Sequence, residues 1–230
     1  MRSPALLPVL LLMGFFAVMP RHCEAQLIND NRMAVWPSLG IQKGFGEHWK
    51  IMFEHSTRMK FQPFMLDESY LQAGVEYSFR YNISVEFNYR FSECYSTERY
   101  FVPEHRLSLE PDFSTNLKRW GFALRPAVQA TFGRDYIRKN INPEWCLRPR
   151  VTVDYNLRKT SLKPFVSLEL FIGQQPEAQF GLYKYRLSLG VSYKLTKKLR
   201  IEGYLREQGG FDSNTNSYSI LGVDLSWRFK

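Results

Sequence analysis

Apolar and polar residues alternate along five runs in the second half of the chain: 145–157, 162–171, 185–195, 199–207 and 218–229. In the last run, Leu221, Val223 and Leu225 share one face, and Gly222 and Asp224 share the other. A period of two is typical of a β-strand with two different faces. The runs have roughly 9–13 residues, against about 5–6 in a usual soluble strand, and a tilted strand needs roughly 9–11 to cross a bilayer. The pattern predicts a membrane β-barrel with an apolar outside and a charged inside.

Weaker alternation occupies the first half of the chain, in the runs 34–43, 49–59, 70–79, 83–91, 105–113 and 120–132. The run 105–113 is interrupted at Pro111, and Pro126 lies within the run 120–132, where a proline indicates an irregularity. This makes about eleven runs, whereas bacterial single-chain barrels have an even number of strands. We therefore predict an all-β, antiparallel up-and-down transmembrane barrel of twelve strands, with ten as the alternative if 34–43 is not a strand.

The connections between the runs alternate in length. Short turns are expected at 44–48, 80–82, 158–161 and 196–198, and long loops at 60–69, 92–104, 133–144, 173–182 and 208–217. Bacterial outer-membrane barrels have short periplasmic turns and longer outer loops. Counting back from Phe229 places the long loops outside the cell.

The N-terminus has the features of a targeting segment. Arg2 gives a short positive region, and Ala5–Met19 is an apolar core as long as that of a signal peptide. We expect cleavage after Ala25, which leaves residues 26–230 as the barrel domain. Lipid attachment at Cys23 is the alternative, although the residues before it lack the small side chains usual at such a site. The compartment would be the outer membrane of a bacterium.

The charged residues are scattered along the strands rather than gathered in a basic run. The net charge of +9 therefore does not indicate a nucleic-acid partner. We expect these residues to line the lumen: Glu54, Arg58, Glu76, Glu86, Arg90, Arg125, Arg148, Arg150, Asp154, Glu169, Arg186, Arg200, Glu202 and Arg206. A barrel of this size has a narrow interior. These charged residues would form either a salt-bridge network that fills the interior or a selectivity lining for a small anionic or polar solute.

Candidate catalytic chemistry is sparse. Outer-membrane lipid hydrolases place a nucleophilic Ser two residues after a His, so that both lie on one strand face. The mature chain instead has Lys50, Thr57 and Leu107 at the second position after its histidines, His48, His55 and His105. The histidines and cysteines show no metal-ligand spacing. We therefore predict no catalytic site, no metal and no cofactor.

Two cysteines, Cys94 and Cys146, remain after the signal peptide is removed, in an oxidising compartment. By the loop count, both lie at the ends of neighbouring outer loops. A disulfide there would stabilise the fold by roughly 3–5 kcal/mol in the loop-entropy model. The alternative is two unpaired thiols.

The sequence resembles an uncharacterised family of Gram-negative outer-membrane barrels, the domain of unknown function 2490. The residues that carry the resemblance are LRPRVTVDYNL at 147–157, PFVSLELF at 164–171, YRLSLGVSYKL at 185–195, LRIEGYLRE at 199–207 and ILGVDLSWRF at 220–229, with WKIMFEHSTR at 49–58 and FNYRF at 87–91. The resemblance implies a location and a fold, and no activity.

The last strand also resembles the signal by which the assembly machinery recognises outer-membrane barrels, in Gly222, Leu225, Trp227 and Phe229, although Lys230 follows the terminal aromatic residue. The expected partners are therefore this machinery and outer-membrane lipid, around a monomer.

The sequence thus favours an integral outer-membrane barrel of structural or small-solute pore type, with a charged lumen. A lipid-modifying hydrolase in the same membrane is the first alternative. The second is a secreted soluble barrel that binds a ligand, but the apolar outward faces would leave a band larger than a soluble monomer tolerates. An activity assay on lipid separates the first two, and detergent dependence separates the third.

Overall fold

The computed structural model describes residues 32–61, 64–79, 82–95, 101–133, 143–173, 180–211 and 217–229. The expected signal peptide, residues 1–25, lies outside this part of the chain. Eleven strands form in the described residues: β1 (Arg32–Phe45), β2 (Trp49–Phe61), β3 (Phe64–Ser78), β4 (Ile83–Tyr95), β5 (Phe101–Leu117), β6 (Trp120–Phe132), β7 (Glu144–Tyr155), β8 (Leu162–Gly173), β9 (Gly181–Lys194), β10 (Leu199–Gly210) and β11 (Tyr218–Phe229). The shortest strands have 12 residues and the longest has 17.

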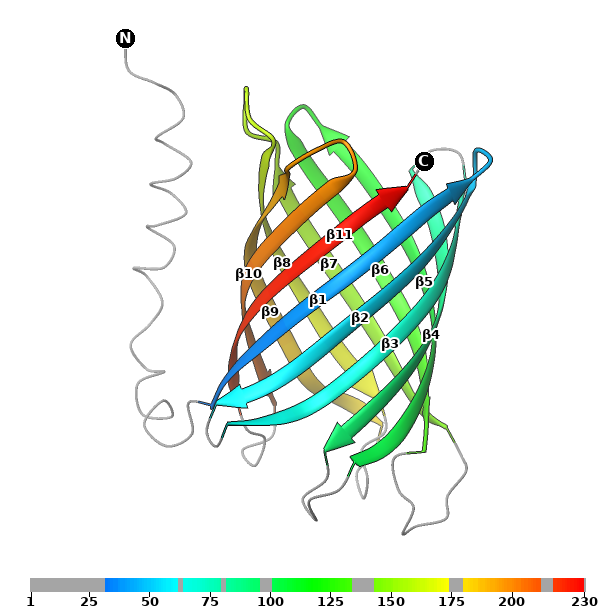
Figure 1. The fold of residues 1–230 in the computed structure, drawn as a ribbon, viewed down its shortest axis with the longest axis vertical. Helices are drawn as coiled ribbons and strands as arrows, with labels where there is room; N and C mark the ends of the chain where they lie inside the picture. The colour runs from blue at the N-terminus through cyan, green and yellow to red at the C-terminus, as the bar shows by residue number, and fades with distance from the viewer. Residues whose placement is uncertain are drawn as a thin grey trace. The chain divides into compact units, whose positions relative to one another are not determined.

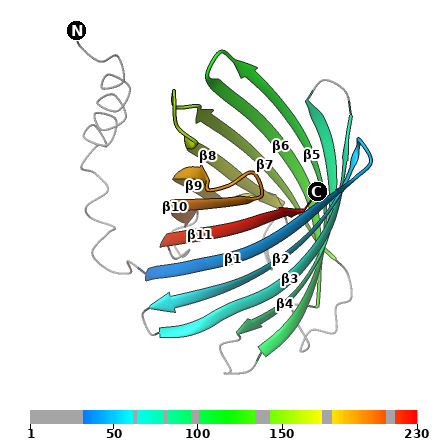
Figure 2. The same cartoon turned by 45° about the horizontal axis from the view of Figure 1, so that its top comes forward.

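The strands close into one barrel, as Figures 1 and 2 show. Consecutive strands pair antiparallel, and β1 pairs β11 in parallel, with Trp36 opposite Gly222 and Leu39 opposite Leu225. The prediction of twelve strands, with ten as the alternative, is therefore wrong for the described residues. An odd number of up-and-down strands leaves the first and last running the same way. The run 34–43 is a barrel strand, and it forms the parallel seam.

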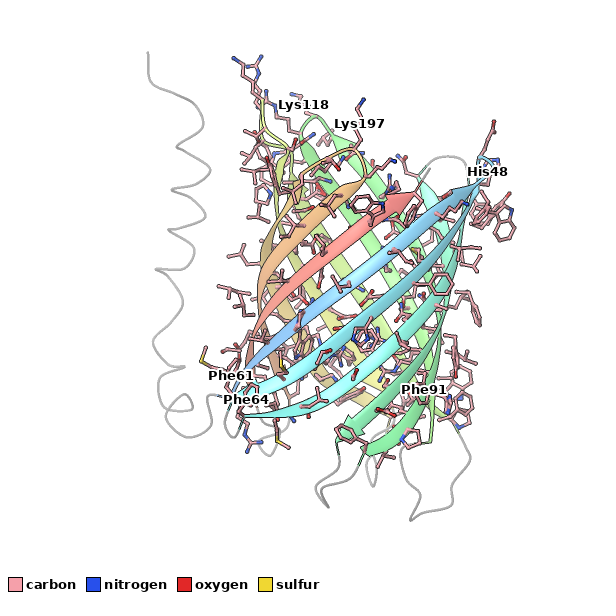
Figure 3. The ribbon with its side chains drawn as sticks, viewed as in Figure 1. His48, Phe61, Phe64, Phe91, Lys118 and Lys197 are labelled. Carbon is pink, nitrogen blue, oxygen red and sulfur yellow. The ribbon has the colours of Figure 1, made fainter. Side chains whose placement is uncertain are left out.

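The two ends of the barrel differ in their connections. Short turns at 46–48, 118–119, 156–161 and 195–198 gather at one end, which we call the short-turn end. Figure 3 shows His48, Lys118 and Lys197 there, with Phe61, Phe64 and Phe91 at the opposite, long-connection end. Asn82, Lys118 and Lys159 adopt positive φ at the short-turn end, as tight turns require.

One predicted loop is wrong. Residues 60–69 were expected to form a long outer loop, but β2 continues to Phe61 and β3 begins at Phe64. The pairing of β2 with β3 shifts register between Arg58 and Met59. Such a bulge changes which residues share a face, so the alternation is lost in the sequence although the strands continue.

Burial is inverted relative to a soluble protein. Outward-facing apolar residues are exposed, as at Leu39 (59%) and Leu71 (61%), whereas polar Asn88 (2%) and Ser92 (0%) are buried inside. A small apolar cluster inside the barrel consists of Ala34, Trp36 and Ile220. An apolar outer band around a polar interior is the arrangement of outer-membrane barrels. Among the described residues there is no helix long and apolar enough to cross a membrane.

Aromatic side chains gather near both ends of the outward face. At the short-turn end, the ring centroids of Trp49 and Tyr77 are 4.8 Å apart, as are those of Trp120 and Tyr155. At the long-connection end, the ring centroids of Phe61 and Phe64 are 5.7 Å apart. Girdles of this kind mark the two lipid–water interfaces of a membrane barrel.

Candidate functional site: the charged lumen

The barrel encloses a cavity of about 660 Å³, to which all eleven strands contribute side chains. The lining is mostly polar and charged. It arises because the inward positions of every strand alternate with the lipid-facing ones. The side chains therefore do not fill the lumen completely.

Ten of the fourteen lumen residues expected from the sequence line this cavity: Glu54, Arg58, Glu86, Arg90, Arg125, Arg148, Arg150, Glu169, Arg186 and Arg206. The other four lie on inward-facing positions closer to the short-turn end. Of these, Glu76 pairs with Lys50 at 2.6 Å and Asp154 pairs with Lys163 at 2.7 Å. Arg200 and Glu202 occupy inward positions at the start of β10.

Glu169 is the centre of the strongest ion-pair cluster. Its Oε1 accepts hydrogen bonds from Arg148 Nε at 3.2 Å and Nη2 at 2.7 Å. Its Oε2 lies 3.4 Å from Arg186 Nη1, and Arg150 Nε lies 3.9 Å from its Oε1. Glu169 is only 6% exposed. Three guanidinium groups around one buried carboxylate leave this part of the wall positively charged.

Other cations rest on aromatic rings. The guanidinium carbon of Arg58 lies 4.3 Å from the ring centroid of Trp36, and Arg58 also pairs with Glu68. The ammonium of Lys184 lies 4.2 Å from the ring of Phe171. Cation–π contacts strengthen when water is excluded, so these rings help to hold charge inside the barrel.

Several residues that line the lumen were not predicted from the sequence. Glu68 lay in the expected loop 60–69, and Lys184 lies just before the run 185–195, beyond a register shift between Phe171 and Ile172. Arg106, which pairs with Glu104 at 2.5 Å, lies in the run that Pro111 interrupts. The signal that could have found it is the regular alternation of Glu104, Arg106, Ser108, Glu110 and Asp112 along β5.

The disulfide expected between Cys94 and Cys146 is not present in the structure. Both residues lie in strands rather than in outer loops, and both line the cavity, from β4 and β7. Three strand spacings separate them, roughly 14 Å around the wall, whereas a disulfide needs Cα atoms within about 7 Å. Cys146 is buried, with its Sγ 3.3 Å from the hydroxyl of Tyr183.

An unusual polar pair lies on the outward face of β2. Thr57 Oγ1 lies 3.4 Å from Nε2 of His55, and Nδ1 of His55 lies 3.0 Å from the carbonyl oxygen of Tyr70. The neighbours of His55 on the adjacent strands are Leu39 and Leu71. The pair thus lies within the apolar band. No group of His, Cys, Asp or Glu among the described residues has the arrangement of a metal site.

Solved structures similar to this chain are outer-membrane barrels. A bacterial polysaccharide outer membrane secretin matches with a TM-score of 0.53 at 13% identity, over 82% of this chain and 68% of that chain. The NanC porin matches with a TM-score of 0.52 at 12% identity, over 82% of this chain and 90% of that chain. LpxR from Salmonella typhimurium matches at 9% identity over 78% and 83%, with a TM-score of 0.47, too low to support an argument.

At these identities the similarity shows the fold alone, a closed all-β barrel of the outer-membrane type. A comparison with curated proteins gives no match. The family model described as "Protein of unknown function (DUF2490)" matches residues 33–219, which include nearly all of the barrel. The resemblance inferred from the sequence is thereby confirmed, and the chain belongs to the DUF2490 family.

Proposed function

We propose that this protein is an integral protein of the bacterial outer membrane whose barrel forms a pore for small polar solutes. The observation that carries the proposal is the polar cavity of about 660 Å³ inside a closed barrel. The apolar outward band and the aromatic girdles support a membrane location. Charged rings inside a pore select solutes by charge and size.

The lumen is narrow because ion pairs cross the inside of the wall. Arg148 pairs with Glu169 and also donates from Nη1 to Gln129 Oε1 at 2.6 Å. Arg125 pairs with Asp112 at 3.0 Å. Such a network limits the pore to small solutes. If the network closed the lumen entirely, the barrel would have a structural role only.

Single-channel conductance of the mature chain, residues 26–230, refolded into a planar bilayer, tests the pore. We expect discrete conductance steps, and larger steps for Arg148→Ala, which removes a side chain that reaches across the lining. Arg158→Ala, in a short turn, serves as the control and should leave the steps unchanged. A chain that inserts into the bilayer without any steps would contradict the pore and favour a structural barrel.

In this proposal the last strand, β11, is recognised by the barrel-assembly machinery. Leu225, Trp227 and Phe229 occupy outward positions, and Gly222 faces inward opposite Tyr204. Truncation of the chain after Leu225 should therefore lower the amount of barrel recovered from the outer-membrane fraction. Recovery equal to that of the full chain would contradict the recognition of β11 by this machinery.

A lipid hydrolase is the second candidate, and the pair His55 and Thr57 is the observation that favours it. If Nδ1–H of His55 donates to the carbonyl of Tyr70, Nε2 can accept the proton of the Thr57 hydroxyl. This is the relation of a base to a nucleophile. Thr57 Oγ1 would attack the ester carbonyl of a membrane lipid while His55 takes its proton and passes it to the leaving lysolipid alcohol. Water would then hydrolyse the acyl ester on Thr57, which releases the fatty acid and restores the Thr57 hydroxyl.

A phospholipid hydrolysis assay in mixed micelles tests this second candidate. We expect fatty-acid release by the wild-type chain and none by Thr57→Val, which keeps the shape of the side chain. Thr115→Val, near the end of β5, serves as the control. Equal release by wild type and Thr57→Val, or no release by either, would exclude the pair as a catalytic site.

A further inference from the structure

Four of the described strands carry an inward-facing Glu-x-x-x-Arg pattern, and on β7 the pair Glu144 and Arg148 runs in the opposite direction to the other three. Those three pairs are Glu54 and Arg58 on β2, Glu86 and Arg90 on β4, and Glu202 and Arg206 on β10. All three strands run from the short-turn end to the long-connection end. The glutamates therefore form one level nearer the short turns, and the arginines form a second level deeper along the lumen.

The two levels are too far apart to neutralise each other within a strand. Four residues of a strand span about 13 Å, and a tilt of about 40° makes this about 10 Å along the barrel axis. We call Glu54, Glu86 and Glu202, with Asp224 opposite Glu202, the glutamate level. We call Arg58, Arg90 and Arg206 the arginine level.

The carboxylates of the glutamate level make no direct ion pair, although arginines such as Arg125 and Arg200 lie near them. Among the described residues, no ion pair involves Glu54, Glu86, Glu202 or Asp224. Glu54 accepts a hydrogen bond from the Tyr70 hydroxyl at 2.6 Å, and Asp224 accepts one from Ser38 at 2.6 Å. The register places Glu86 between two further carboxylates, those of Glu76 and Glu110. Like charges directly opposite each other destabilise a sheet.

Two of the three cations of the arginine level also make no direct ion pair. Arg90 donates to the amide oxygen of Gln72 from Nε at 2.8 Å and from Nη2 at 2.6 Å. Arg206 donates to Ser188 Oγ at 2.8 Å. In the described part of the chain neither arginine makes an ion pair. The lumen therefore holds charges of both signs, at two separate heights, that no direct ion pair neutralises.

Both levels face open space. The cavity of about 660 Å³ is lined by Glu54 and Glu86 as well as by Arg90 and Arg206. A second cavity of about 140 Å³ adjoins Glu54 and Glu86 and is also lined by Asn88. Asn88 lies between Glu86 and Arg90 on β4 and is 2% exposed, so a buried polar amide also borders this space.

We propose that the lumen binds a zwitterionic solute whose opposite charges lie about 10 Å apart. Its anionic group binds at the arginine level and its cationic group at the glutamate level. An uncompensated charge inside the barrel wall is costly, and such a solute neutralises both levels together. A simple anion is attracted by the arginine level and repelled by the glutamate level, and a simple cation behaves in the opposite way. The proposal rests on the pore proposed above, because the solute must enter the lumen.

Equilibrium dialysis of triglycine against the refolded, detergent-solubilised chain, residues 26–230, tests the proposal. An extended tripeptide separates its ammonium and carboxylate by about 10 Å. N-acetyl-triglycine carries only the negative charge, and triglycine amide only the positive one. We expect triglycine to bind about tenfold tighter than either capped analogue, the ratio that one charged hydrogen bond supports.

Two double variants assign the charges to their levels. Glu54→Gln with Glu86→Gln should make triglycine bind no better than N-acetyl-triglycine. Arg90→Gln with Arg206→Gln should make it bind no better than triglycine amide, and it leaves no carboxylate without its ion-pair partner. Lys197→Gln, in a short turn, is the control and should bind like wild type. The gel mobility of the unheated barrel checks that each variant folds.

Equal affinities of the wild-type chain for triglycine and either capped analogue would overturn the proposal. So would a preference for triglycine that survives in both folded double variants. Dialysis measures binding without transport. A bilayer without conductance steps would therefore overturn only the pore. Equal affinities for triglycine and a capped analogue would overturn only the zwitterion site.

Discussion

Glu169 on β8 lies directly opposite Arg186 on β9, with its Oε2 3.4 Å from Arg186 Nη1. Its other oxygen accepts hydrogen bonds from Arg148 on β7. One carboxylate therefore connects three consecutive strands across the inside of the wall. Because the carboxylate is buried, its partners depend on it for charge compensation.

Replacement of Glu169 by Gln should destabilise the barrel by about 3–5 kcal/mol, because it leaves buried guanidinium groups without their counter-charge. Urea unfolding in detergent micelles, followed by Trp fluorescence, measures the change. Glu86→Gln is the matched control, and it should not destabilise the barrel, since Glu86 faces two carboxylates in register. Equal unfolding midpoints for Glu169→Gln and wild type would contradict the role of Glu169 as the centre of the cluster.

Gly222 should tolerate no side chain, because a Cβ there would overlap the ring of Tyr204, its neighbour in register. We expect Gly222→Ala to lower the yield of folded barrel after refolding and to lower its stability by about 1–3 kcal/mol, as overpacking does. Gly203, where a Cβ would meet nothing within 4 Å, provides the control variant Gly203→Ala. Equal yields of the two variants would show that the ring moves aside.

The parallel seam predicts a specific cross-link. Leu39 and Leu225 are opposite each other on the outward faces of β1 and β11. In a chain whose native cysteines are replaced by serine, Leu39→Cys with Leu225→Cys should form a disulfide on mild oxidation, since neighbouring strands lie about 4.8 Å apart. The unfolded, non-reduced chain should then migrate faster on a gel. Leu39→Cys with Leu221→Cys, displaced by four residues, should not cross-link. Cross-linking of this second pair instead would mean a different closing register.

The separation of charge along the lumen predicts an asymmetric current. With carboxylates at one level and guanidinium groups at another, the pore should pass more current at one polarity of the applied voltage than at the other. The asymmetry should be clear at about 0.1 M salt, where the screening length is about 10 Å, and weak at about 1 M, where it is about 3 Å. The double variant Glu54→Gln with Glu86→Gln should reduce it. Symmetric current at low salt would contradict two charged levels.

The alternation of residues allowed the fold class to be predicted from the sequence. Along β7, and along β11 from Leu221 to Phe229, each inward position is polar or small and each outward position is apolar, because lipid and lumen select opposite side chains. The prediction was wrong in the connection between β2 and β3, where a register shift interrupts the period. It was also wrong in the number of strands, because the alternation gives about eleven runs and the even strand number usual in bacterial barrels favoured twelve.

The lumen is only partly predictable for a related reason. A period of two shows that Arg148 and Glu169 face inward, but their hydrogen bonds depend on the register between β7 and β8. The stacking of Arg58 on Trp36 likewise depends on the pairing of β1 with β2, together with side-chain conformation. The distance between Cys94 and Cys146 depends on the number of strands between them.

The parallel seam also determines where the two ends of the barrel chain emerge. β1 begins at Arg32 at the long-connection end, and β11 ends at Phe229 at the short-turn end. In an even-stranded barrel both ends would open into the same compartment. If the long connections face the medium, as the lengths of the loops predict, an epitope inserted before Arg32 should be detected by antibodies on intact cells. One placed after Phe229 would be detected only in permeabilised cells.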